Sequence, residues 1–326
     1  MRILQRYFVV GGAGFIGSHF IDRLLEDPAI SAVTLYDNFS SGRKWHYEHH
    51  DGDSRLKAIS GDVVDIGHLA ASMIGHDAVI HLASNPDIAR AIIEPDIDFR
   101  QGTCLTNNVL EAMRRCGTSF ILYASGSGVY GDLGEREVNE NYGPLKPIST
   151  YGASKLAGEV LICAYCHMCD FTGLAFRFAN VVGPRQTHGV GLDFLRQLLQ
   201  NPHKLRILGD GTQSKSYIYV EDVVEAVLST PARTHDRFAV YNVATRDYIT
   251  VEEIAHLAME CVGLDSRQVE LEYTGGNRGW KGDVPVVRLN TDRIRSLGWI
   301  CRSGSREALR RSMTAMLSDL RTGRLR

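Results

Sequence analysis

The sequence predicts an α/β fold in which a doubly wound parallel sheet is followed by a smaller, discontinuous C-terminal lobe. Three observations support this prediction. Short β-branched runs alternate with longer helical patterns through the first half of the chain, as βαβ units require. A glycine-rich turn joins the first run to the first helical pattern. Beyond Pro184 the alternation breaks into shorter elements, which indicates a different architecture.

Strands are predicted where apolar runs rich in β-branched residues end in turn residues. In the first half these runs are RYFVV at 6–10, AVTLYD at 32–37, LKAISGD at 56–62, AVIHLAS at 78–84 and SFILYASGS at 119–127. Helical spacing of apolar residues predicts helices from about Gly14, through 105–116, and from Tyr151 to about Met168. A further strand at 172–184 ends in a Gly-Pro turn.

A chain of 326 residues exceeds one typical domain, so two lobes are expected. We expect residues 1–179 to form a dinucleotide-binding domain, to which a segment near 216–246 returns. Residues 180–326 are expected to form most of the substrate lobe. Its first elements are predicted as a helix at 192–202, a turn at 208–213 and a strand at 215–220.

Composition excludes several classes of partner. The formal net charge of -2 offers no basic excess for a phosphodiester backbone, so no nucleic acid is expected. No apolar stretch approaches the roughly 20 residues that span a bilayer, and the N-terminus does not resemble a secretory signal. The 7 cysteines are odd in number and scattered, which favours reduced thiols. A cytoplasmic protein is therefore expected.

The stretch VVGGAGFIGSH is typical of a dinucleotide-binding turn of the Rossmann type. Gly11, Gly14 and Gly17 lie between the first strand and helix, where glycine lets the backbone approach a diphosphate. Asp37 ends the next strand, 20 positions after Gly17, where a carboxylate binds ribose hydroxyls and favours NAD over NADP. A capped turn is the alternative for Asp37 and for Asp62. The residues expected to contact NAD are Gly11, Gly14, Phe15, Ile16, Gly17, Asp37, Asn38, Asp62, Val63, Leu82, Ala83, Tyr151 and Lys155.

The stretch STYGASK contains the strongest catalytic candidates. Tyr151 and Lys155 are four residues apart and therefore share one face of a helix. A phenol titrates near pH 10, and its pKa must fall by roughly 3 units before it can act as a base near neutrality. A neighbouring ammonium favours the phenolate in this way. Such a pair is common on helix surfaces, so it has little weight by itself.

Several motifs together identify a resemblance. GGAGFIG, HLAS, VYG, YGASK and RFANVVGPR occur in the order seen in the extended short-chain dehydrogenase/reductase family. Within it the chain resembles the nucleotide-sugar epimerases and dehydratases, particularly the archaeal-type UDP-glucose 4-epimerase group. The resemblance implies that Tyr151 removes the proton of the sugar 4-hydroxyl while tightly bound NAD takes the hydride, giving a transient 4-keto sugar. It also implies a homodimer that pairs helices at 103–115 and 152–168.

Two glycines depart from the family pattern. The site serine or threonine of the family corresponds to Gly126, and an asparagine of the family corresponds to Gly102. We expect Ser125, Ser127 or a water molecule to replace the missing hydroxyl. The 4,6-dehydratases carry Asp and Glu directly after the site residue, and UDP-glucuronate decarboxylases carry a Glu at the position of Gly128. Both reactions are therefore disfavoured.

The resemblance also assigns residues to a UDP-sugar or another NDP-sugar. Asn180 corresponds to a family position that contacts the diphosphate, and Lys215 stands where many relatives carry a phosphate-binding arginine, for which lysine supplies a point charge instead of a bidentate group. Two further cations, Arg278 and Lys281, are also suited to a diphosphate. A structural role in a turn is the alternative for Asn180, and a solvated loop charge is the alternative for Arg278 and Lys281. Asp193 and Phe194 are candidates for a base pocket, although an ordinary amphipathic helix explains them equally well. The expected substrate-binding residues are Asn180, Asp193, Phe194, Lys215, Arg278 and Lys281.

Two clusters of cysteine and histidine residues could suggest a metal site, but structural roles are expected for both. Cys163, Cys166 and Cys169 lie on one predicted helix, which cannot easily wrap four ligands around one ion, so packing is expected. The histidines of HYEHH, His46, His49 and His50, are expected in a solvated loop, and no metal is predicted.

The predicted function is an NAD-dependent NDP-sugar 4-epimerase, most simply for UDP-glucose and UDP-galactose or a modified relative. One alternative is another type of NDP-sugar oxidoreductase, in a polysaccharide or secondary-metabolite pathway. It would exchange its cofactor with solution. A second alternative is a catalytically weak protein that binds NAD or a nucleotide sugar, because Gly126 and Gly102 lack side chains.

Overall fold

The computed structural model describes residues 4–325, which divide into two compact units. The first unit contains the chain up to Val129, together with Ser149–Arg177 and Val224–Tyr241. The second contains Tyr130–Ile148, Phe178–Val223 and Asn242 onward. The change of unit after Arg177 lies close to the predicted boundary at 179, whereas residues 130–148 belong to the second unit.

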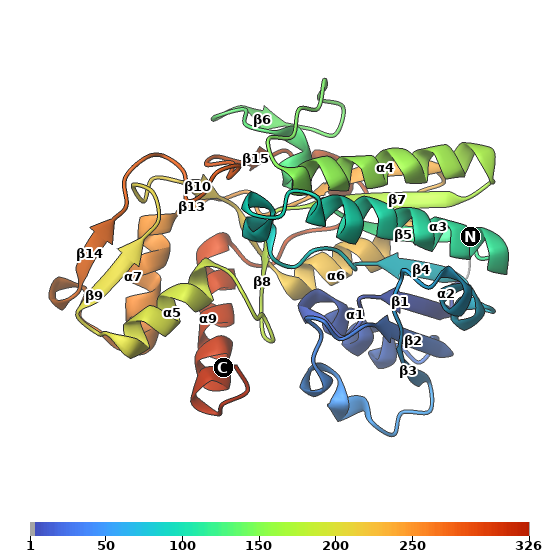
Figure 1. Ribbon diagram of the computed structural model, residues 1–326, viewed down its shortest axis with the longest axis horizontal. Helices are drawn as coiled ribbons and strands as arrows, with labels where there is room; N and C mark the ends of the chain where they lie inside the picture. The colour runs from blue at the N-terminus through green and yellow to red at the C-terminus, as the bar shows by residue number, and fades with distance from the viewer. Residues whose placement is uncertain (1–3, 326) are drawn as a thin grey trace. The chain divides into compact units, whose positions relative to one another are not determined.

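The first unit is built on a seven-stranded sheet in the order β12-β7-β5-β4-β1-β2-β3 (Figure 1). Pairing is parallel between all neighbours from β3 through β5, as the βαβ rhythm predicts. The order reverses between β1 and β4, which is the place where such sheets bind ligands at their carboxyl ends. The strands are β1 Arg6–Val10, β2 Ala32–Asp37, β3 Leu56–Ser60, β4 Ala78–His81, β5 Phe120–Gly126, β7 Thr172–Phe178 and β12 Phe238–Val243.

Helices cover both faces of this sheet. One face and its helices α2, α3 and α4 enclose a core cluster that includes Phe8, Val10 and Ile162. Val9 points to the opposite face because strand side chains alternate, and α1 covers that face. The predicted α/β fold is thus confirmed. The helices are α1 Phe15–Glu26, α2 Ile66–Met73, α3 Cys104–Cys116, α4 Thr150–Met168 and α6 Val220–Ser229, with the π-helix η4 Phe99–Thr103 before α3.

The second unit consists of short strand pairs and helices. Helices α5, α7 and α9 pack together, and strand β11 pairs in parallel with β8. The predicted strand at 172–184 is divided into β7 and β8, which belong to different units. The elements are β6 Glu137–Val138, β8 Asn180–Val182, α5 Val190–Gln200, β9 Lys204–Ile207, β10 Ser214–Lys215, β11 Tyr217–Tyr219, β13 Ile249–Thr250, α7 Val251–Val262, β14 Glu270–Tyr273, β15 Arg288–Leu289, α8 Asp292–Ser296 and α9 Ser305–Arg321.

None of the helices within residues 4–325 is long and apolar enough to cross a membrane.

His81, at the end of β4, is expected to make folding sensitive to acid. Its ring is buried, Nε2 lies 3.1 Å from Thr106 Oγ1, and burial together with nearby Lys155 lowers its pKa to about 3. Between its ordinary pKa of 6.5 and this value the unfolded chain binds a proton that the folded chain does not. The free energy of unfolding should therefore fall as pH drops below about 6.5, by up to about 1.4 kcal/mol per pH unit.

Urea unfolding of the wild type and of His81→Gln between about pH 7.5 and 5.5 measures this slope. The variant should lose less stability than the wild type over this range, and the exposed His235→Gln should behave like the wild type. Equal slopes in all three proteins would contradict the prediction.

Candidate active site

The glycine-rich turn after β1 leaves no room for side chains. Gly11 has a φ of +81°, and a Cβ added there would lie 2.8 Å from the backbone nitrogen of Ala83. A Cβ on Gly17 would lie 2.3 Å from the carbonyl oxygen of Gly11. Gly14 precedes α1 without a side-chain cap, so the turn offers the first amides of α1 to an anionic ligand. This turn fits the diphosphate of a dinucleotide.

Three polar residues meet at the carboxyl ends of β2 and β3. Asp37 is buried, and its two carboxylate oxygens accept backbone N–H groups of Ala13 at 3.0 Å and Phe39 at 2.8 Å. Burial raises the pKa of Asp37. The exposed Asn38 donates its side-chain amide to Asp62 at 3.0 Å. The predicted ribose-binding and adenine-side residues therefore lie together.

The other residues expected to contact the cofactor lie around the same turn. Phe15 and Ile16 begin α1 and are half-buried. Leu82 and Ala83 follow β4, and their amides donate to the last carbonyl of β1 at 2.9 and 3.1 Å. Val63 follows β3 and is buried.

Asp37→Asn is expected to reduce the preference for NAD over NADP about tenfold, or about 1.4 kcal/mol. The amide removes the negative charge that repels a 2'-phosphate and cannot accept hydrogen bonds through both of its terminal atoms. Titration of cofactor-free protein with each dinucleotide measures the ratio. The exposed Asp62→Asn is the control and should change the ratio by less than about twofold. An unchanged ratio of NAD to NADP affinity in Asp37→Asn would show that Asp37 does not contact the ribose.

Tyr151 and Lys155 lie one turn apart on α4, which begins after the Ser149 cap. Lys155 Nζ donates to the carbonyl oxygen of Ala124 at 2.8 Å and lies 5.5 Å from the centre of the Tyr151 ring. Burial lowers the pKa of Lys155 to about 8 and raises the pKa of Tyr151 to about 12. The phenol is therefore protonated near neutral pH in this structure.

Ser84 supplies a hydroxyl at Tyr151 that motif comparison did not single out. It follows β4, and its hydrogen bond with the Tyr151 phenol lowers the pKa of Tyr151, against the effect of burial. Ser84 is the last residue of HLAS, so the motif itself contained the signal. Its position after a strand that adjoins β1 and β5 would have supported the assignment.

A buried carboxylate ties the loop containing Ser84 to the start of α4. Asp98 accepts the side-chain amide of Asn85 at 2.8 Å and the hydroxyl of Thr150 at 2.7 Å. Asp98 is 1% exposed and Asn85 is 3% exposed, so these hydrogen bonds are shielded from water. Because Asn85 follows Ser84 and Thr150 precedes Tyr151, the bonds hold the serine hydroxyl beside the phenol.

The two serines that flank Gly126 have different surroundings. The buried Ser125 hydroxyl donates to Glu159 at 2.5 Å, and Glu159 is bound by Arg177 at 2.7 Å. Ser127 is half-buried and begins a short helical turn. A Cβ on the next residue, Gly128, would lie 3.5 Å from Gly152 Cα, so this turn runs beside the start of α4.

Gly102 lies in the π-helix η4, and Ser154 of α4 occupies the space that a side chain at 102 would need. A Cβ on Gly102 would lie 2.0 Å from Ser154 Oγ and 3.2 Å from Ser154 Cβ. Ser154 is buried and receives a hydrogen bond from Thr103 at 3.2 Å. The glycine is thus a close contact between η4 and α4 rather than an empty place in the site.

In the second unit, two predicted substrate cations contact the same residue, Asp283. Lys215 Nζ lies 2.6 Å from Asp283 Oδ1, and Arg278 donates to the Asp283 carbonyl and pairs with Asp132. Lys281 is exposed. Arg288 was not predicted, although it donates to the carbonyl of Ser214 at 3.0 Å, next to Lys215.

The remaining predicted substrate residues lie in β8 and α5. Asn180 begins β8 and is half-buried. Asp193 lies at the surface on α5, and desolvation by the protein around its carboxyl group raises its pKa. Phe194 is only 4% exposed, which favours the amphipathic-helix interpretation of this residue.

The expectation that all three histidines of HYEHH lie in a solvated loop is wrong for His46. Its ring is buried, and Nδ1 lies 2.8 Å from the carbonyl oxygen of Ala13 in the glycine-rich turn. On α4, Cys166 belongs to the buried core cluster and Cys163 and Cys169 are half-buried free thiols. These positions agree with packing roles for the cysteines.

Comparison with known proteins agrees with this geometry. Residues 7–244 match the model of the NAD dependent epimerase/dehydratase family. The chain is 32% identical over 306 residues to the UDP-glucose 4-epimerase of Mycolicibacterium smegmatis, covering 90% of this chain and 93% of that protein. It is 30% identical over 266 residues to the dTDP-glucose 4,6-dehydratase of Streptomyces griseus, covering 80% of each.

Solved structures show the same fold. A crystal structure of a UDP-galactose 4-epimerase has a TM-score of 0.85 and 36% identity, covering 97% of this chain and 99% of that chain. The NAD complex of UDP-glucose 4-epimerase from Thermus thermophilus has a TM-score of 0.83 and 28% identity, covering 95% and 98%. Of these relatives, the Thermus thermophilus epimerase is solved with NAD, and the curated relatives include both an epimerase and a dehydratase.

Proposed function

Because the chain belongs to the NAD dependent epimerase/dehydratase family, with NAD as its cofactor, we propose that it is a nucleotide-sugar 4-epimerase. The proposed substrates are UDP-glucose and UDP-galactose, or a modified UDP-sugar. One observation carries this choice: the Tyr151 phenol has Ser84 and Lys155 beside it. The residues at 127 and 128 are serine and glycine, so this turn lacks the carboxyl groups of the dehydratases and decarboxylases.

The catalytic residues act on protons at the sugar. NAD, when bound, supplies a hydride acceptor and donor for carbon 4. Tyr151 takes the proton of the 4-hydroxyl as the 4-keto sugar forms and returns it after the ketone has turned its other face. The Ser84 hydroxyl favours the phenolate of Tyr151, and we expect the Lys155 ammonium, 5.5 Å from the centre of the ring, to act in the same direction.

Ser84 is the proposed replacement for the hydroxyl that Gly126 lacks. Ser125 is a weaker candidate because its hydroxyl is used in the buried contact with Glu159. Ser127 remains a candidate, since its turn runs beside the start of α4. Variants of all three serines distinguish between them.

The second unit is proposed to bind the nucleotide diphosphate. Lys215, Arg278 and Asn180 belong to this unit, and the two cations are drawn together by Asp283. A homodimer through α3 and α4 also remains a prediction. It is supported by Val160 and Met168 of α4, which are 61% and 84% exposed.

Proton NMR of the purified protein, incubated separately with UDP-galactose, UDP-N-acetylgalactosamine and UDP-glucuronate without added cofactor, tests the activity. The matching 4-epimer should appear with at least one of them, because bound NAD is regenerated in each cycle. Release of carbon dioxide or a 4-keto-6-deoxy product would instead assign a decarboxylase or dehydratase. No reaction, despite NAD released on denaturation, would contradict epimerisation of these sugars and favour a binding role.

A further inference from the structure

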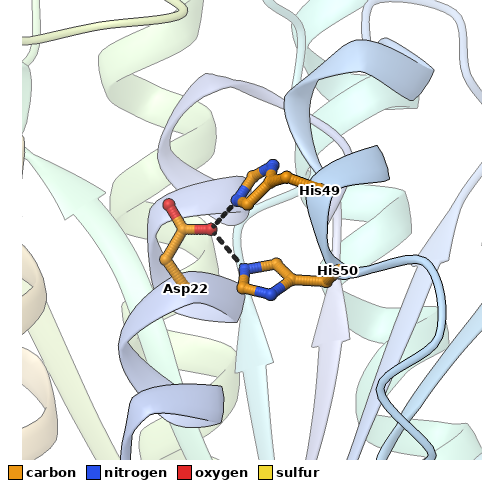
Figure 2. Close-up of side chains that lie close together, drawn as sticks. All are labelled: Asp22, His49 and His50. Atoms are coloured by element: carbon orange, nitrogen blue, oxygen red, sulfur yellow. Dashed lines mark hydrogen bonds and ion pairs between the residues drawn. The ribbon is translucent and has the colours of Figure 1, made fainter.

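We propose that Asp22, His49 and His50 form a binding site for a divalent transition-metal ion of the zinc class. Asp22 lies on α1, and the two histidines lie between β2 and β3, in the short helix η2 Glu48–His50. Figure 2 shows both imidazole rings directed at one carboxylate oxygen. Asp22 Oδ1 lies 2.9 Å from His49 Nε2 and 2.8 Å from His50 Nε2.

The donor set selects the kind of ion. Two imidazole nitrogens and one carboxylate oxygen are ligands for Zn²⁺, Co²⁺ or Ni²⁺, whereas Mg²⁺ and Ca²⁺ prefer oxygen alone. The three ligand atoms lie within 4.8 Å of one another, as atoms that share one ion must. On binding, each imidazole releases the Nε2 proton of its hydrogen bond to Asp22 or carries its proton on Nδ1 instead, so that Nε2 faces the ion, and water completes the coordination.

Burial and neighbouring groups also suit an ion site. The side chains of Asp22 and His50 are 23% and 19% exposed, which orders them, while His49 at 51% leaves a path from solvent. The second oxygen of Asp22 lies 3.9 Å from Nδ1 of His19, one turn earlier on α1. A further imidazole beside the carboxylate helps to hold its orientation.

An ion at this site would attach the loop between β2 and β3 to α1, and this loop contacts the glycine-rich turn after β1. The same loop reaches the Ala13 carbonyl through the backbone N–H of Arg43 at 3.1 Å and through His46 Nδ1 at 2.8 Å. Ala13 in turn donates its N–H to Asp37. An ion between Asp22 and the histidine pair therefore links α1 to the loop beside the cofactor residues. Its role is structural and does not depend on the reaction catalysed.

Calorimetric titration of EDTA-treated full-length protein with Zn²⁺ tests the site. We expect one ion per chain, and at least tenfold weaker binding in Asp22→Asn and in the double variant His49→Ala/His50→Ala. The exposed His235→Ala is the matched control and should bind as the wild type does. Co²⁺ should give the absorption bands of a site with nitrogen ligands in the wild type and lose them in the double variant.

Thermal unfolding gives a readout that separates loss of binding from loss of folding. Zn²⁺ should raise the midpoint of the wild type and of His235→Ala, and leave both ligand variants unchanged relative to their own metal-free midpoints. The proposal is overturned if the wild type binds less than half an equivalent of Zn²⁺, or if the ligand variants bind as tightly as the control.

Discussion

Tyr151→Phe is expected to lower kcat for epimerisation by at least about 10³-fold while NAD remains bound. Phenylalanine keeps the ring that Lys155 Nζ approaches at 5.5 Å, so the packing of α4 is preserved. It removes the oxygen that takes and returns the proton of the sugar hydroxyl. The cofactor turn at Gly11 and Gly17 is unchanged, and NAD binding should therefore be retained.

The rate is measured by proton NMR, and bound NAD by its release on denaturation. Tyr165→Phe is the matched control because Tyr165 lies on the same helix but directs its hydroxyl at Glu111, at 2.6 Å. This control should keep the wild-type rate. Undiminished epimerisation by Tyr151→Phe would refute the proposed role of the phenol.

Ser84→Ala is expected to lower kcat about 30-fold, corresponding to about 2 kcal/mol for a hydrogen bond to a charged oxygen. The Ser84 hydroxyl stabilises the phenolate, and its loss raises the pKa of Tyr151. The rising limb of the dependence of kcat on pH should consequently move to higher pH. A residue with only a packing role would not shift this profile.

Three further variants identify which serine hydroxyl takes the place of the one that Gly126 lacks. Ser84→Thr should restore most of the rate because it retains an oxygen at the same place. Ser127→Ala should stay within about twofold of the wild type. Ser125→Ala should mainly reduce stability, since it leaves the buried Glu159 with one donor fewer. If Ser127→Ala alone lost activity, the replacement for Gly126 would be Ser127 rather than Ser84.

The sequence predicts the parts of this protein that depend on short spacing. The glycine turn spans seven residues, and Tyr151 and Lys155 are separated by one helical turn, so local periodicity places them correctly. The alternating strands and helices likewise predict the sheet and its parallel pairing. These signals arise from backbone geometry that nearby residues determine.

Contacts between distant segments could not be predicted in this way. The Asp98 carboxylate joins Asn85 to Thr150, 13 and 52 positions away, and no spacing rule connects such residues. The burial of His46 likewise depends on how its loop packs against Ala13. Ser84 was within a recognised motif, but its role depends on where the start of α4 lies.

The contact between Gly102 and Ser154 has a consequence for how this enzyme can change. Because a Cβ at 102 would lie 2.0 Å from Ser154 Oγ, a side chain at 102 requires the Ser154 hydroxyl to move or to be removed. A mutational path toward the asparagine that the family resemblance implies at position 102 must first relieve the contact with Ser154, so the order of the two substitutions affects the stability of the intermediate. The effects of the two substitutions on the free energy of unfolding should therefore be non-additive. Of the two orders in which they can be acquired, the one that changes Ser154 first should be the less destabilising.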